Sequence, residues 1–210
     1  MVDLPRLLRV ERSRLADLLG ELDAEDWTRP TLCTAWTVRE TVAHLTAAAS
    51  TRTPTWMLTM VRSRFDTDRH NDRLLRRHLG ADPAATLDAF TATTSSTIAP
   101  FGVLDAALGE VVVHGQDIAR PLDLQLDPSP DALRTVVEFF AHNDFAVNRA
   151  SLVRGLQLRP IDLDLVLNDG PAVRGTALDL VLAMAGRPQA ADGLEGEGAI
   201  VLGERLAELT

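Results

Sequence analysis

The stretch Gly109-Glu110-Val111-Val112-Val113-His114-Gly115-Gln116-Asp117 decides how the rest of the chain is interpreted. It belongs to segment 101–120, where apolar residues recur at helical spacing around a polar stripe until Pro121 ends the pattern. Four positions separate Glu110 from His114, so a helix places both side chains on one face, about 5–6 Å apart at Cβ. Both could contact one metal ion, with Asp117 orienting His114 from behind. Such a pair also occurs by chance on surface helices, so a third ligand must converge on it.

Upstream of this stretch the pattern is helical as well. Apolar spacing predicts helices over 5–22, 37–50, 54–65 and 83–97, while 66–80 is crowded with Arg and Asp. Thr37 and Glu40 have the spacing of a capping box, which places the start of the second helix at Thr37. That helix contains His44, which is either the third ligand or a histidine satisfied within the core.

Downstream, the composition changes near residue 155. A helix is predicted from the turn at 127–131 to about Arg149, followed by a strand within 156–167 and a second strand at 173–176. A helix over 177–185 should end at Gly186, and the apolar run 199–202 suggests one more strand before a short terminal helix. We therefore predict a mainly α protein, with a helical bundle at 1–150 and a small α+β domain at 151–210.

Composition excludes several classes of function. The 210 residues carry a net charge of −9, which argues against nucleic acid or an anionic membrane as a partner. All 21 basic residues are arginine, so lysine chemistry is excluded. A single cysteine, Cys33, rules out an intrachain disulfide, and residues 1–10 do not have the pattern of a signal peptide. Together these features predict a cytoplasmic protein.

Two motifs and the tail resemble one known family. Trp27-Thr28-Arg29-Pro30-Thr31-Leu32-Cys33-Thr34-Ala35-Trp36-Thr37-Val38-Arg39-Glu40, followed by Val42-Ala43-His44-Leu45, is similar to the signature of the mycothiol-dependent maleylpyruvate isomerase family, within the DinB-like superfamily. The stretch 109–122 resembles its second signature, and 173–198 resembles its C-terminal domain. The two motifs are specific for the superfamily but not for one reaction.

The resemblance implies a DinB-like four-helix bundle that binds a divalent metal, usually zinc. The family's ligand positions correspond here to His44, Glu110 and His114. It also implies mycothiol as thiol co-substrate, which the metal activates for addition to an electrophilic small molecule, in an isomerase or a thiol transferase. One alternative is a non-catalytic protein that holds metal and a small ligand. Another is a structural metal with Asp117 as fourth ligand.

Arginines are the candidates for contact with an anionic substrate such as a dicarboxylate. Arg187, after the predicted end of a helix, is the candidate catalytic residue; its alternative role is to bind the carbonyls of that helix end. The arginines of segment 62–77 are the other candidates, with a solvated surface as the favoured interpretation.

Three remaining side chains are interpreted as structural. Cys33 is expected to be packed, since the family's thiol comes from the co-substrate, and Trp27 and Trp36 are expected to pack between helices. The sequence leaves the oligomeric state open between monomer and homodimer.

Overall fold

The helix that carries His44 begins where its capping residues predict. In the computed structural model, which describes residues 2–33, 35–144 and 149–209, the Thr37 hydroxyl accepts a hydrogen bond from the Glu40 backbone N–H. The Glu40 carboxylate in turn accepts one from the Thr37 N–H, at 2.9 Å. This reciprocal pair satisfies two backbone donors that the start of α2 (Val38–Ser50) would otherwise leave free.

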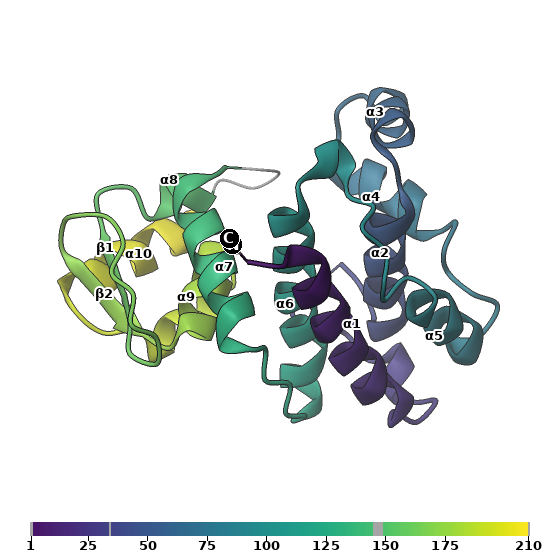
Figure 1. The fold of residues 1–210 in the computed structure, drawn as a ribbon, viewed down its shortest axis with the longest axis horizontal. Helices are drawn as coiled ribbons and strands as arrows, with labels where there is room; N and C mark the ends of the chain where they lie inside the picture. Colours follow the sequence, from purple (N-terminus) through teal and green to yellow (C-terminus); the bar gives the residue numbers. More distant parts are fainter. Residues whose placement is uncertain (1, 34, 145–148, 210) are drawn as a thin grey trace. The chain divides into compact units, whose positions relative to one another are not determined.

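The first compact unit, residues 1–127, is a helical bundle, as the sequence predicts for the N-terminal part of the chain. Helices α1 and α2 each pack against both α5 and α6, so the four close into a ring (Figure 1). The leucines that recur along α1 at spacings of three and four include Leu8, Leu15 and Leu19, which are buried in the core. The bounds are α1 Leu4–Gly20, α5 Pro83–Thr91 and α6 Leu104–Ala119, with single turns at Asp26–Thr28, Pro100–Gly102 and Arg120–Leu122.

Two shorter helices lie between α2 and α5. Helix α3 (Thr53–Arg62) ends three residues before the predicted limit at Phe65, and α4 (Thr67–Leu75) occupies the Arg- and Asp-rich segment, for which no element was predicted. Helix α4 packs against α2 and α3 through His70, Leu74 and Leu75, while its arginines face solvent.

The second unit, residues 128–210, is a small α+β structure. Strands β1 (Gln157–Pro160) and β2 (Ala172–Gly175) pair in parallel, with Gln157 opposite Ala172 and Pro160 opposite Gly175. Helix α9 packs against both α7 and β1, and α10 packs against β2. The helices are α7 Pro130–His142, α8 Arg149–Leu152, α9 Ala177–Met184 and α10 Glu197–Ala207, with a turn at Pro188–Gly193.

The strand predicted at 199–202 is wrong, because these residues belong to α10. Gly198, Leu202 and Leu206 are buried at a spacing of four, whereas Ile200 is 68% exposed. The run is therefore one face of a helix plus an exposed residue. Similarly, the strand expected within 156–167 is confined to 157–160, and the helix expected to reach Arg149 ends at His142, with residues 145–148 outside the described part of the chain.

The contacts of α7 show how the units divide. The bundle predicted over 1–150 includes this helix, but it packs against α8 and α9, and the compact units separate between residues 127 and 128. Compact units need not fold independently, so the domain boundary at residue 150 stays a prediction. Among the described residues, no helix combines the length and apolarity needed to cross a membrane.

Candidate metal centre

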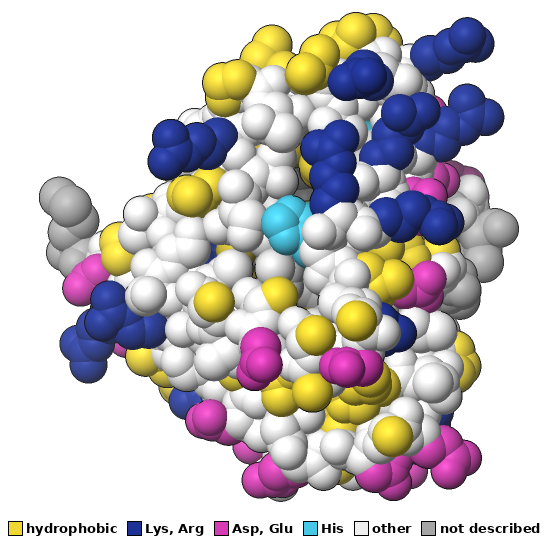
Figure 2. Space-filling model, turned by 90° about the vertical axis from the view of Figure 1, so that its right-hand side faces the viewer, with side chains coloured by type: hydrophobic (Ala, Val, Ile, Leu, Met, Phe, Trp, Pro, Cys, Tyr) yellow, Lys and Arg dark blue, Asp and Glu magenta, His cyan; other side chains and the backbone are white. Residues whose placement is uncertain are grey.

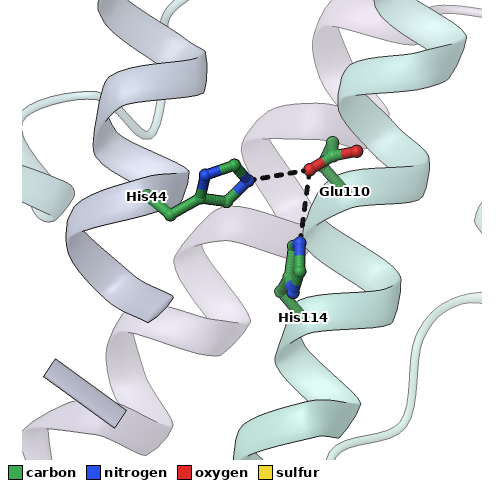
Figure 3. A group of neighbouring side chains, drawn as sticks. All are labelled: His44, Glu110 and His114. Carbon is green, nitrogen blue, oxygen red and sulfur yellow. Dashed lines mark hydrogen bonds and ion pairs between the residues drawn. The ribbon is translucent and has the colours of Figure 1, made fainter. Parts of the chain in front are cut away.

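Three side chains from two helices meet in the first unit. His44 projects from α2, and Glu110 and His114 project from successive turns of α6, which packs against α2 (Figure 3). Glu110 Oε2 lies 3.0 Å from His44 Nε2 and 3.3 Å from His114 Nε2. The candidate ligand atoms of the three residues all lie within 4.8 Å of one another, which forms the only cluster of this kind within the described ranges.

These distances suit a small divalent ion. Ligand atoms about 2.0–2.1 Å from a tetrahedral zinc lie about 3.3 Å from one another, close to both observed carboxylate–imidazole separations. Two imidazoles and one carboxylate form a donor set that catalytic zinc sites use, with a further position left for water or substrate. Both histidines are buried, but the Glu110 side chain is 26% exposed, so solvent reaches the cluster on the carboxylate side.

Asp117 orients one of the ligands. Its Oδ2 accepts a hydrogen bond from His114 Nδ1 at 2.9 Å, and the side chain is completely buried. With hydrogen on Nδ1, His114 presents Nε2 toward Glu110. Asp117 thus lies on the opposite side of the imidazole from the cluster, where it contacts His114 as expected of an orienting residue and is not placed as a fourth ligand.

Trp36 covers the two imidazoles, a position that the sequence analysis did not predict. Its ring centroid is 4.6 Å from that of His44 and 5.8 Å from that of His114. The loop before α2 holds it there, because the Trp36 carbonyl accepts hydrogen bonds from the backbone and the hydroxyl of Thr31. Trp36 thus packs against side chains of both α2 and α6, and these are the histidines of the candidate site; Trp27 is buried as expected.

The capping residues that located the start of α2 could also have drawn attention to Trp36. The residue directly precedes Thr37, the cap of the helix that carries His44. Moreover, the backbone N–H of Leu32 donates to the Asp117 carbonyl at 3.0 Å, so this loop is fastened to α6 beside His114. Nothing in the periodicity of either helix reports this contact between distant segments.

The charges in the cluster depend on one another. Burial alone would raise the pKa of Glu110, but hydrogen bonds from His114 and His44 hold that pKa well below its usual range. Burial lowers the pKa of His44 despite its bond to Glu110. Burial would also lower the pKa of His114, but Asp117 and Glu110 outweigh it and raise the value to about 9. The two carboxylates of Glu110 and Asp117 therefore favour a protonated His114 in the metal-free protein.

Three of the candidate arginines have partners away from this cluster. Arg187 belongs to the second unit, where its guanidinium donates to the Ala185 carbonyl at 2.6 Å. This contact is the alternative role expected of it, beside the left-handed Gly186 that ends α9. In segment 62–77, Arg69 pairs with Asp66 and Arg76 with Asp72 at the surface.

Comparison with known proteins supports the family resemblance that the motifs suggested. Residues 8–67 match the family model of the mycothiol maleylpyruvate isomerase N-terminal domain. Two solved structures share the fold: a crystal structure of the mycothiol-dependent maleylpyruvate isomerase and one of its histidine-to-alanine mutant. Each has a TM-score of 0.60 and 15% identity, over 94% of this chain and 92% of that chain. No protein of curated function matches the sequence.

Proposed function

We propose that this chain, whose residues 8–67 match the mycothiol maleylpyruvate isomerase N-terminal domain, is a metal-dependent enzyme that uses a low-molecular-weight thiol. The observation that carries the proposal is the cluster of His44, Glu110 and His114, in which three ligand atoms from two helices lie within 4.8 Å of one another and the Glu110 side chain is 26% exposed. A structural zinc usually has four protein ligands, whereas an open position suits a metal that acts on a substrate.

Each residue of the centre has a distinct role in this proposal. His44 and His114 hold the ion through Nε2 and Glu110 holds it through a carboxylate oxygen. Asp117 keeps the hydrogen of His114 on Nδ1, so that Nε2 stays available. Trp36 excludes water from one face of the imidazoles and restricts their rotation.

The bound ion, for which zinc is our first candidate, would lower the pKa of a thiol so that the thiolate is present at neutral pH. Mycothiol is the thiol we propose, from the family match. The second substrate is an electrophilic small molecule, such as a dicarboxylate with a conjugated double bond. For an isomerase, thiol addition would be followed by rotation and thiol loss; for a transferase, the thiol would remain attached.

Metal analysis of purified variants tests the centre. Wild-type protein should hold about one divalent ion per chain, and His44→Ala and His114→Ala should hold almost none. His142→Ala is a matched control, because this histidine lies exposed at the end of α7 and bonds to the Glu138 carbonyl. Undiminished metal in the His44 and His114 variants would refute the site.

A separate assay tests catalysis. The metal-loaded protein should consume a maleyl-type electrophile in the presence of mycothiol, and chelation should abolish the reaction. A protein that binds metal at these residues but consumes no electrophile with any small thiol would instead be the non-catalytic binding protein. The same assay on Arg187→Ala decides whether that arginine contributes. Its role, a cytoplasmic location and the choice between monomer and homodimer remain predictions.

A further inference from the structure

Helix α3 is inverted with respect to the usual amphipathic pattern. It turns Thr59 inward, and the next buried residue, Ser63, is polar as well. The residues that face solvent are apolar: Met57, Leu58 and Val61, continued by Phe65 after the helix and by Phe101 from a neighbouring turn, are each between 50% and 74% exposed. We call these five residues the α3 apolar face. A surface helix normally buries its apolar side, so this face calls for an occupant.

Within the described part of the bundle, the packing of α3 leaves Met57, Leu58, Val61 and Phe65 largely exposed. Its substantial contacts there are with α4 and with the turn Pro100–Gly102. The Trp56 ring anchors α3 by packing against the rings of His70 and Phe101, at centroid distances of 4.9 and 5.3 Å. The helix is therefore a peripheral ridge with its apolar side outward, rather than the wall of a groove.

The charge around the face selects the occupant. Residues 52–65 contain three arginines and no acidic residue, and the whole segment 52–80 carries a net charge of +4, which leaves −13 for the rest of the chain. Figure 2 shows this division on one side of the molecule: apolar side chains along the upper edge, where α3 lies in Figure 1, arginines around them, and acidic side chains below. The net charge of −9 that argued against an anionic membrane is thus an average over an uneven distribution.

We propose that the α3 apolar face and its arginines bind the surface of an anionic lipid bilayer. A ridge of apolar side chains rimmed by cations is the arrangement by which short helices lie in the plane of a bilayer interface. The apolar face enters the boundary between headgroups and acyl chains, and Arg62 and Arg64 contact lipid phosphates. A symmetric pair of copies joined at this face would bring two clusters of like charge together, which disfavours a dimer as the occupant.

Sedimentation of the full-length protein with lipid vesicles tests this proposal. Binding should be at least about tenfold stronger to vesicles containing about one-third phosphatidylglycerol than to pure phosphatidylcholine, and it should weaken with salt. The triple variant Met57→Ser, Leu58→Ser, Val61→Ser should bind at least about tenfold more weakly than wild type. Arg62→Gln and Arg64→Gln should each reduce binding about fivefold.

The matched control removes two apolar side chains of the second unit that are at least as exposed as Met57, in Ile161→Ser, Val166→Ser, and should bind like wild type. An unchanged thermal midpoint in the triple variant would show that lost binding is not lost folding. The proposal is overturned if the wild type ignores anionic vesicles, or if the triple variant binds them as well as the control does. A dimer that the triple variant dissociates, without vesicle binding, would overturn it in favour of a second copy.

Discussion

Replacing Asp117 by Asn tests the link between the fold and the metal centre. The side chain is completely buried and accepts the Nδ1 hydrogen of His114 at 2.9 Å. Asparagine has nearly the same shape but can offer an N–H to Nδ1, which would move the imidazole hydrogen to Nε2, where the metal must bind. Partners of this kind typically contribute 10–100-fold to metal affinity, about 1.4–2.8 kcal/mol.

The expected size of the loss depends on pH, since Asp117 also supports the proton that competes with the metal. It helps raise the pKa of His114 to about 9, so below that pH the metal must displace a proton. At pH 7 the variant loses a well-oriented ligand, but the proton that competes with the metal for His114 is also bound more weakly. Near pH 9 the competition is almost gone, and the full 10–100-fold loss should appear.

The assay is competition for zinc between the protein and a chromophoric chelator, at pH 7 and near pH 9. Asp105→Asn is the control, because Asp105 lies in the first turn of the same helix and outside the cluster. Asp105→Asn should bind zinc as tightly as wild type. If Asp117→Asn also does so at both pH values, the proposed orientation of His114 is wrong.

Three further predictions concern the same unit. Zinc binding should change the tryptophan fluorescence of the wild type but leave that of Trp36→Phe nearly unchanged, because Trp36 lies on the rings of His44 and His114. Equal fluorescence changes in the two proteins would show that the Trp36 ring does not report on the metal site. At pH 7, binding should release about one proton, since the pKa of His114 is raised to about 9 and that of His44 is lowered. Metal affinity should accordingly rise with pH until about 9 and then level off. Calorimetry in buffers of different ionisation enthalpy measures the number of protons released, and the release of no proton would contradict the assignment of His114 as a ligand. Thr37→Ala, which removes the cap of α2, should cost about 1 kcal/mol and lower the thermal midpoint by about 2–4 °C, and an unchanged midpoint would show that the capping box contributes nothing.

The parts of the fold that the sequence predicts are those with a local cause. Thr37 and Glu40 lie three positions apart and cap α2 as expected, and Gly186 ends α9 through its positive φ of 81°. Over a few residues, the period of a strand and the period of a helix fit the same apolar run, so the local pattern does not distinguish them. The run 199–202 reads as a strand in isolation, but its helical character depends on Gly198 and Leu206, which lie outside it.

The candidate site divides in the same way. Glu110 and His114 share a face of α6 through their spacing alone, and Asp117 follows from the same helix geometry. The contribution of His44 requires α2 to pack against α6 in one particular register, and that of Trp36 requires the loop before α2 to be fastened to α6 through the Asp117 carbonyl. The family motifs suggested the first of these contacts but not the second.

Two contacts of Asp117 link the ligand His114 to the loop that carries Trp36. Its carboxylate fixes the imidazole of His114, and its backbone carbonyl accepts the N–H of Leu32, four residues before Trp36. A displacement of α6 at this point would therefore alter the orientation of one ligand and the cover over both histidines at once. Because the first contact is made by the side chain and the second by the backbone, Asp117→Asn disturbs only the first. Metal affinity should therefore fall while the Leu32 amide keeps the slow hydrogen exchange that its bond to the Asp117 carbonyl gives it, a separation that a general loosening of the bundle would not produce.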